Sequence, residues 1–351
     1  MDKQTDLQAI VAPLCDWFET GKRLLPWRIE PTPYRVWISE IMLQQTRIEA
    51  VIPYFERFMA ELPDVPSLAS VDPDRLMKLW EGLGYYSRAR NLQNAAQQMM
   101  THHGGALPAD YEALRALAGI GDYTAGAIAS IAFGIPVPAV DGNVLRVLAR
   151  LTASHEDVMK PAVRKELTAL AASLVPPDRP ASFNQGLMEL GERVCVPNTM
   201  PHCEACPIAD CCAVAGLPEA AGLPYRAPKK PRRIEHRTVY VLLTDETPRR
   251  VLLHKRPASG LLAGLWELPN TQDEEPLPLS LQATGEDMIL TDSRHIFSHI
   301  EWRMRGVLRI VKPTALPQGY EFVGLPALSV DHALPTAFRA YAQMLPVWLG
   351  E

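Results

Sequence analysis

The chain has no long apolar run, and its N-terminus has no apolar centre. The longest apolar stretch covers residues 127–140 and is interrupted by Pro136 and Pro138, so it is too short and too broken to cross a membrane. The N-terminal sequence MDKQTDLQAI lacks the apolar segment of a secretory signal peptide. We therefore expect a cytoplasmic protein.

An excess of basic residues is also absent. The 35 Lys and Arg against 40 Asp and Glu give a net charge of -5. This balance argues against a protein that coats nucleic acid with a uniformly basic surface, although it leaves room for a local basic face. No internal repeat of about 20 to 50 residues is present, which argues against a repeat architecture. The length of 351 residues predicts two or three domains, each with its own core.

Cysteine is scarce, and most of it lies in one place. Five of the six cysteines fall between residues 195 and 212, and clustering of this kind in a reducing compartment indicates metal ligation more often than disulfides. A CxxC pair, Cys203 and Cys206, is followed directly by Pro207. Four thiolates in such a run can surround one metal centre, and the spacing alone suits either zinc or an iron-sulfur cluster.

Two glycines, Gly119 and Gly121, stand between segments with helical patterns, residues 111–117 and 125–133. The pattern predicts a tight turn between helices, whose backbone N–H groups can hold a phosphate. A turn that only packs two helices would have the same sequence. About twenty residues after Gly121, Asp141 stands in a second predicted turn, Val-Asp-Gly-Asn. A phosphate clamp followed by a carboxylate suggests chemistry on a nucleic acid.

A second acidic residue, Glu40, lies in residues 33–47, which are helical by their apolar period. Its neighbours one turn away include Val36, Trp37 and Leu43. A carboxyl group among apolar side chains can have a raised pKa and act as a general acid near neutrality. The alternative is a solvated residue on the outer face of the helix.

The second half of the chain changes its period. Residues 213–237 are rich in proline and basic residues and read as a linker, which could follow DNA phosphates or simply be solvated. Residues 239–243, 251–254 and 301–310 have strand patterns, and a helix is predicted over 334–349. We expect an α/β unit after the linker.

Several of these segments together resemble the endonuclease III superfamily of DNA base-excision glycosylases. The matching segments are LRALAGIGDYTAG with its trailing Asp141, WISEIMLQQT, GLGYYSRARNL and the cysteine run. The C-terminal HKRPASGLLAGLWELPN is similar to the Nudix-like domain of MutY-type adenine DNA glycosylases. The resemblance covers nearly the whole chain. It implies a multidomain protein: an all-α helix-hairpin-helix region with an iron-sulfur loop, followed by an α/β Nudix-like domain.

The resemblance also implies domain boundaries. Residues 1–225 would form the catalytic region, with a six-helix part at about 29–136 and a cluster-bearing part at about 1–28 plus 137–225. Residues 226–237 would be the linker and residues 238–351 the domain that recognises 8-oxoguanine.

In such an enzyme Glu40 would protonate the adenine ring nitrogen, and Asp141 would stay ionised beside the oxocarbenium centre of the sugar. Tyr123 and Asn143 would support these two carboxyl groups. The residues that the resemblance implies for adenine or DNA binding are Trp27, Arg28, Leu43, Gln44, Gln45, Thr46, Leu83, Tyr85, Gly119, Gly121, Glu189, Phe297, Ser298 and His299. Phe297, Ser298 and His299 match the loop that contacts 8-oxoguanine.

Of the two metal centres that the spacing allows, the resemblance implies a 4Fe-4S cluster. Its ligands would be Cys195, Cys203, Cys206 and Cys212. Here the first gap is seven residues where the superfamily has six, and Cys212 rather than Cys211 keeps the last gap at five.

The implied function is monofunctional hydrolysis of the N-glycosidic bond of adenine opposite 8-oxoguanine or guanine, in base excision repair. The partner would be double-stranded DNA, bound by a monomer associated with the nucleoid. A pyrimidine glycosylase with lyase activity would need a lysine where this chain has Tyr123. A non-catalytic lesion binder would not need both Glu40 and Asp141. A Nudix hydrolase would need a Glu-rich helix, which the prolines of TQDEEPLPLS prevent.

Overall fold

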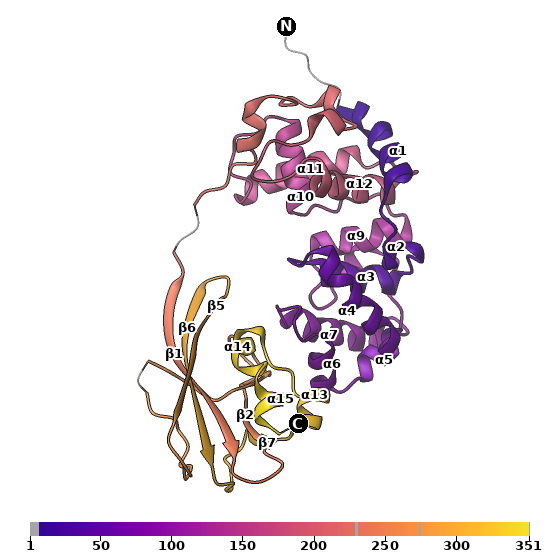
Figure 1. Ribbon diagram of the computed structural model, residues 1–351. Helices are drawn as coiled ribbons and strands as arrows, with labels where there is room; N and C mark the ends of the chain where they lie inside the picture. The colour runs from indigo at the N-terminus through magenta and orange to yellow at the C-terminus, as the bar shows by residue number, and fades with distance from the viewer. Residues whose placement is uncertain (1–6, 229–230, 274, 351) are drawn as a thin grey trace. The chain divides into compact units, whose positions relative to one another are not determined.

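The computed structural model describes residues 7–228, 231–273 and 275–350 (Figure 1). The chain divides into two compact units. The first consists of Met1–Ser70 and Asn91–Pro228, and the second of Val71–Arg90 and Lys229–Glu351. The domain boundaries expected from the sequence stay a prediction. No helix among the described residues is long and apolar enough to cross a membrane.

The first unit is built from helices. In chain order they are η1 (Leu7–Ile10), α1 (Val11–Gly21), α2 (Pro26–Ile29), α3 (Pro33–Leu43), α4 (Ile48–Glu61), α5 (Val65–Ser70), most of α7 (Ser87–His102), α8 (Tyr111–Arg115), α9 (Asp122–Phe133), α10 (Gly142–Leu151), α11 (Pro161–Leu174), α12 (Pro180–Arg193), η2 (Cys203–Ala205), η3 (Ala209–Cys211) and η4 (Pro218–Gly222). The helical region expected from the sequence is confirmed.

Local signals set where the helices that carry the site begin and end. Helix α3 starts with Pro33 after Thr32, whose side chain accepts a hydrogen bond from the backbone N–H of Arg35. It ends at Leu43, so the prediction of a helix through residue 47 is wrong at its last turn. Gln45 has a φ of 58°, a conformation that an α-helix cannot contain.

One core of the first unit gathers α1, α10, α11 and α12. Leu14, Phe183, Leu148 and Leu167 are buried there, one from each helix. Leu14 approaches α12 closely at Gly186, where an added Cβ would lie 3.1 Å from the Leu14 side chain. This core carries the start of α10, and with it Asp141.

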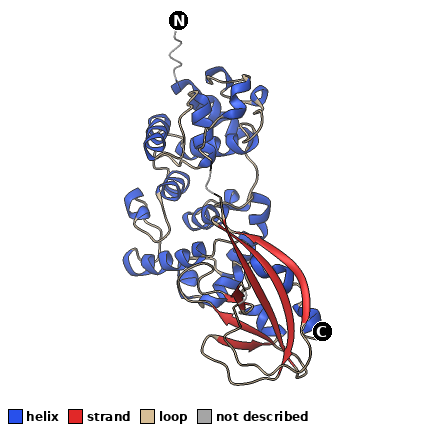
Figure 2. Cartoon of the chain, turned by 90° about the vertical axis from the view of Figure 1, so that its left-hand side faces the viewer, coloured by secondary structure: helices blue, strands red, loops and turns tan. Residues whose placement is uncertain are grey.

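The second unit contains one sheet, whose strands are red in Figure 2. Its strand order is β3-β2-β1-β6-β5, and β4 pairs with β1 and β7 with β2. Its strands are β1 (Arg233–Thr244), β2 (Val251–Lys255), β3 (Trp266–Glu267), β4 (Asn270–Gln272), β5 (Met288–Ile296), β6 (Ile300–Val311) and β7 (Tyr320–Val323). The long central pair, β1 and β6, is parallel from Arg233 opposite Ile300 to Thr244 opposite Val311. The α/β unit expected after the linker is confirmed.

Short helices pack on the sheet. They are α13 (Leu325–Val330), η5 (Thr336–Phe338), α14 (Arg339–Ala342) and α15 (Leu345–Trp348). Phe338 and Tyr341 share a buried core with Trp302 and Met304 of β6. The prediction of one continuous helix over 334–349 is wrong. Pro346 has no backbone N–H to continue a helix, and it stands in the first turn of α15 instead.

Candidate active site

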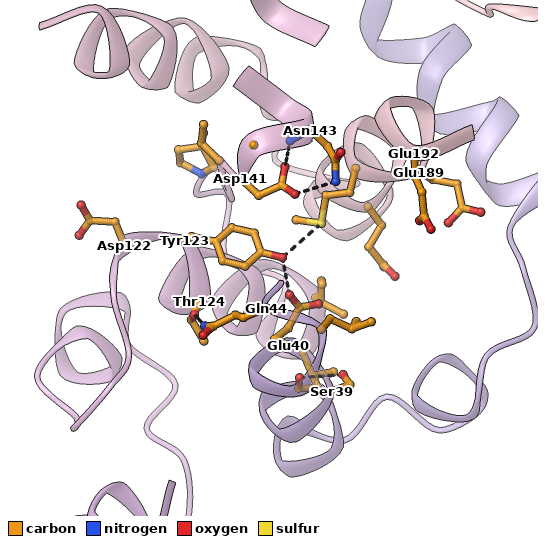
Figure 3. A pocket seen from close by; sticks show the side chains of 18 of the residues that line it. Ser39, Glu40, Gln44, Asp122, Tyr123, Thr124, Asp141, Asn143, Glu189 and Glu192 are labelled. Carbon is orange, nitrogen blue, oxygen red and sulfur yellow. Dashed lines mark hydrogen bonds between the residues drawn. The ribbon is translucent and has the colours of Figure 1, made fainter. Parts of the chain in front are cut away.

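A cavity of about 1380 Å³ opens within the first unit. Its wall is formed mainly by α2, α3, α9, α11, α12 and the start of α10. Both carboxyl groups singled out in the sequence line it, and Figure 3 shows Tyr123 between them.

Glu40 lies on α3 and its side chain is buried, with 7 % of its surface exposed. The Tyr123 hydroxyl donates a hydrogen bond of 2.5 Å to Oε2 of Glu40. Burial raises the pKa of Glu40 to about 7, although the Tyr123 hydrogen bond acts against this rise. A share of Glu40 can therefore remain protonated near neutrality, as a general acid requires. The interpretation as a solvated helix-face residue is wrong.

Asp141 caps the N-terminus of α10. Its Oδ1 accepts the backbone N–H groups of Asn143 and Val144, both at 2.8 Å, and its Oδ2 accepts Nδ2 of Asn143 at 2.8 Å. Burial raises the pKa of Asp141 above its usual value, and these donors and the nearby Arg146 oppose that rise.

The two carboxyl groups thus have different surroundings. Glu40 accepts one hydrogen bond, from a hydroxyl, whereas Asp141 accepts three hydrogen bonds from N–H groups and lies at a helix N-terminus. Hydrogen bonds to the charged form favour that form, and so does the positive end of a helix. Of the pair, Asp141 is the better stabilised as an anion and Glu40 the better stabilised as an acid.

A second wall of the cavity carries an ion-paired carboxylate. Glu189 of α12 has 1 % of its side chain exposed and pairs with Nε of Arg23 at 2.6 Å and with Nη2 of Arg28 at 2.8 Å. Burial alone would raise the pKa of Glu189, but the two arginines lower it below its usual value. Trp27 lies beside Arg28 on α2 and packs edge-on against Phe55, with 5.4 Å between the ring centres. Trp27, Arg28 and Glu189 all line the cavity. The adenine pocket that the resemblance implies for them stays a prediction.

The segment after α3 also reaches the cavity. Leu43, Gln44, Gln45 and Thr46 all line it. Nε2 of Gln44 donates to Oγ1 of Thr124 on α9 at 3.2 Å. Gln45 is exposed, and its left-handed backbone directs its side chain away from the helical path.

The predicted turn between helices forms between α8 and α9. Gly119 has a φ of 73°, and a Cβ at this position would lie 2.6 Å from Cβ of Asn91. Gly121 has a φ of -92° and is the N-cap of α9. Only Gly119 is therefore a glycine by backbone necessity, and Gly121 has open space around it. Both glycines line the cavity.

The remaining predicted DNA contacts belong to the second unit. Leu83 and Tyr85 lie in a turn where Tyr85 has a φ of 47° and is 47 % exposed. Phe297, Ser298 and His299 form the connection between β5 and β6, with Ser298 and His299 exposed and Phe297 packed against Trp302 at 4.9 Å. Their contacts with DNA stay a prediction.

Four cysteines line a separate small pocket in the first unit: Cys195, Cys203, Cys206 and Cys212. Cys211 does not line it. Arg150 has 1 % of its surface exposed, and its Nη1 lies 3.2 Å from the sulfur of Cys195. Over residues 7–228, 231–273 and 275–350, no three His, Cys, Asp or Glu side chains converge closely enough to hold a metal ion as they stand.

Sequence reasoning missed the residues that hold Asp141 and Asn143 in place. Asn184 of α12 is buried, accepts the N–H of Ala139 at 2.8 Å and donates to the carbonyl of Val137 at 2.9 Å. It therefore fixes the chain that leads into Asp141. A lone Asn in a helix pattern carries no signal of such a role in the sequence.

Asn143 is supported from a different direction. Its Oδ1 accepts Nη2 of Arg146 at 2.9 Å, and Nη2 also donates to the carbonyl of Gly191 at 2.7 Å. At Gly191 a Cβ would lie 2.6 Å from Cβ of Asn143, so only glycine allows α12 this close to α10. Gly191 is far from Asn143 and Arg146 in the sequence, and only the fold brings it to them.

Comparison with known proteins identifies two families that match parts of the chain. Residues 38–173 match the HhH-GPD superfamily of base excision DNA repair proteins, and residues 238–344 match the NUDIX domain. The adenine DNA glycosylase of Mus musculus is 38% identical, over 84% of this chain and 69% of the mouse protein. That of Homo sapiens is 35% identical, over 97% of this chain and 75% of the human protein.

Solved structures match the helical region. A thermostable thymine-DNA glycosylase superposes with a TM-score of 0.54 at 28% identity, covering 59% of this chain and 94% of its own. A trapped endonuclease III-DNA covalent intermediate superposes with a TM-score of 0.51 at 22% identity, covering 61% of this chain and 97% of its own. This second match shows a similar fold. The helical region, the sheet-containing domain and the relatives that match most of the chain all indicate the same family. The chain belongs to the adenine DNA glycosylase family, within the HhH-GPD superfamily of base excision DNA repair proteins.

Proposed function

We propose that this adenine DNA glycosylase removes adenine that is paired with 8-oxoguanine, and also with guanine. The target nucleotide must leave the duplex before a side chain can reach its glycosidic bond. A cavity of about 1380 Å³ with Glu40 and Asp141 in its wall supports this proposal, since it has room for a flipped nucleotide. The observation that carries it is Glu40, buried, held by Tyr123 and with a pKa of about 7.

Glu40 is the proposed acid. Cleavage builds negative charge on the departing adenine, and a proton delivered to its ring nitrogen removes that charge. Tyr123 donates to Oε2, which leaves the other carboxyl oxygen to carry the proton. Burial, with the charges of Glu40 and Asp141, raises the pKa of Tyr123 well above its usual value, so this hydroxyl remains a donor.

Asp141 is the proposed stabiliser of the sugar. The departing base leaves positive charge on the sugar ring, which a nearby carboxylate stabilises. Asn143 and the N-terminus of α10 favour the ionised form of Asp141 against the effect of burial, and they fix its orientation. Two carboxyl groups with opposite protonation states in one cavity match the pattern of glycosidic bond cleavage.

We assign the adenine pocket to Trp27, Arg28, Leu43, Gln45 and Glu189. All five line the cavity that Glu40 and Asp141 share. In the DNA, Gln44, Gln45 and Thr46 would enter the minor groove, and Gln44, Gln45 and Tyr85 would fill or support the vacated stack. Gly119 and Gly121 would hold a phosphate through the turn before α9.

The reaction is proposed to stop at the abasic site. A lyase step needs an amine that forms a Schiff base with the sugar, and a phenol cannot do this. By the family resemblance, Tyr123 occupies the position in the hairpin where a glycosylase with lyase activity has its lysine. Borohydride added during turnover should therefore trap little protein on DNA, and strands should break only after alkali. Efficient trapping would assign the step to a lysine elsewhere.

A 4Fe-4S cluster is proposed at Cys195, Cys203, Cys206 and Cys212. The four thiols line one pocket, and the Arg150 guanidinium beside Cys195 suits a thiolate ligand. A bound cluster would brace the loop or relay electrons, and it takes no part in hydrolysis. The protein should be brown with about four irons. Cys212→Ser should lose iron while Cys211→Ser keeps it, and stoichiometric zinc in colourless protein would contradict the assignment.

Recognition of the oxidised base is assigned to Phe297, Ser298 and His299 in the Nudix-like domain, residues 238–351. Two exposed polar side chains at the end of a hairpin are suited to reading a few polar atoms. One protein molecule is enough to read a single lesion, so a monomer is expected. It would act at the nucleoid in the cytoplasm, where the DNA is.

One substrate panel tests this function. Purified protein should release adenine opposite 8-oxoguanine faster than opposite guanine, and should leave a thymine glycol duplex and free 8-oxo-dGTP unchanged. Cleavage of the thymine glycol duplex would favour a pyrimidine glycosylase, and hydrolysis of the free nucleotide would favour a Nudix hydrolase. Binding without any turnover would favour a lesion binder.

A further inference from the structure

Residues 71–90 are part of the second compact unit, although the chain before and after them belongs to the first. They include α6 (Pro73–Leu79) and the turn with Leu83 and Tyr85. The sequence places this segment in the middle of the predicted catalytic region. Its contacts with the Nudix-like domain include polar ones at three places.

The first contact is an ion pair with two short distances. Nζ of Lys255, at the end of β2, lies 2.8 Å from Oδ1 and 2.7 Å from Oδ2 of Asp74. The same Nζ lies 5.2 Å from the centre of the Trp266 ring, which limits its freedom. Asp74 is in the first turn of α6, where the helix dipole also favours a negative charge.

The second contact joins α6 to the end of α13. Nζ of Lys78 donates to the carbonyl of Leu328 at 2.9 Å and pairs with Glu81 at 2.7 Å. A cation there stabilises the carbonyls that a helix C-terminus leaves unpaired. Oε1 of Glu81 in turn accepts the backbone N–H of Leu334 at 2.6 Å.

The third contact lies beyond the turn. Nη1 of Arg90 donates to the carbonyl of Ala263 at 2.7 Å. Between the anchors, Nη2 of Arg88 donates to the carbonyls of Leu83 and Gly84, at 3.1 Å and 3.0 Å. The turn that presents Tyr85 is therefore braced internally and fixed to the Nudix-like domain on both sides.

We propose that Asp74, Lys78, Glu81 and Arg90 are positioning residues that join the Tyr85 turn to the Nudix-like domain, so that this turn and the Ser298-His299 loop engage the DNA at the lesion as one rigid unit. This inference rests on the proposed recognition of 8-oxoguanine by that loop. When two DNA-contacting segments are held in fixed geometry, the second engages without a further loss of freedom. Loosening their connection weakens discrimination against guanine and leaves the chemical step alone.

The Asp74–Lys255 pair provides a test by charge exchange. Asp74→Lys and Lys255→Asp each place like charges in contact, and the double variant restores an ion pair in reverse. We expect each single variant to lower the ratio of single-turnover excision opposite 8-oxoguanine to that opposite guanine by about fivefold or more. Excision opposite guanine should stay near the wild-type rate, and the double variant should recover most of the ratio.

A matched control lies in the same domain. Asp287 and Arg309 form an ion pair with two contacts of 2.6 Å and have no part in the proposed connection. Asp287→Lys should leave the excision ratio unchanged. A loss as large as that of Asp74→Lys would assign the effect to general destabilisation of the domain and overturn the inference.

Hydrogen exchange supplies a second measurement for variants of low activity. In Glu81→Ala the amide of Leu334 should exchange faster, while amides in the centre of β6 keep their protection. Unchanged ratios in both single variants, a double variant that stays impaired, or unchanged exchange at Leu334 would each overturn the inference. A wild-type protein without preference for 8-oxoguanine would instead contradict the proposed function, which separates the two failures.

Discussion

At the scale of single residues, the pKa of Glu40 predicts how the reaction depends on pH. Burial raises this pKa to about 7, and the acid acts only in its protonated form. Single-turnover excision should therefore be lost as the pH rises through about 7. Asp141 must be ionised, so the rate should also fall at acid pH. A rate that climbs steadily from neutral to alkaline pH would contradict the assignment of Glu40.

The Tyr123 hydroxyl allows a finer test of the same pair. Its hydrogen bond lowers the pKa of Glu40 against the effect of burial. Tyr123→Phe removes that bond while keeping the ring, so the pKa of Glu40 should rise. The alkaline limb of the pH profile should then move to higher pH. A shift to lower pH would show that Tyr123 stabilises the neutral acid instead.

Asn184 is a residue whose loss should be felt in stability. Asn184→Ala leaves the N–H of Ala139 and the carbonyl of Val137 without their partner in a buried place. We expect a loss of about 1 to 3 kcal/mol in the free energy of unfolding, measured by urea denaturation. Asn94→Ala, on the exposed face of α7, serves as the control and should change little.

At the scale of elements, the turn before α9 contains two glycines with different requirements. Gly119 has a positive φ and no room for a Cβ, so Gly119→Ala should lower the free energy of unfolding by about 1 kcal/mol or more. Gly121 has neither restriction. Gly121→Ala should fold like the wild type and weaken DNA binding if the turn approaches a phosphate. Equal stability losses in both variants would contradict this distinction.

Elements with a strong period were predictable from the sequence, and elements fixed by tertiary contacts were not. The apolar spacing of α1 and the alternation of β6 predicted both correctly, because one face of each is buried. Strand β5 was missed, since its exposed residues, Met288 and Ile289 among them, do not alternate clearly. Glu40 and Asp141 could be singled out because their sequence surroundings resemble the family motifs. Asn184 and Gly191 could not, because their roles depend on contacts with residues more than forty positions away.

At the scale of the whole molecule, chemistry and lesion recognition should be separable. Ser298→Ala with His299→Ala removes the polar groups of the exposed loop and leaves Phe297 packed on Trp302. Hydrogen bonds to the lesion are worth about 1 kcal/mol each, so the double variant should lose several-fold to about a hundredfold of its preference for 8-oxoguanine. Excision opposite guanine should barely change. Equal losses on both substrates would assign the loop to general DNA binding.

The full-length chain is the right material for that comparison. Cutting near Tyr225 would remove the partners of residues 71–90 together with the recognition loop, since both lie in the second unit. Any change in the preference for 8-oxoguanine over guanine could then come from either loss. Point variants in the intact protein change either the loop or the partners of residues 71–90, and not both.

The most direct test of the account compares wild type with Glu40→Gln on a duplex that contains adenine opposite 8-oxoguanine. The amide keeps the shape of the carboxyl group and has no acidic proton to give. Single-turnover excision should fall by about 100-fold or more, with duplex affinity close to wild type. Excision within about tenfold of wild type would remove Glu40 from the role of acid, and with it the mechanism proposed for this cavity.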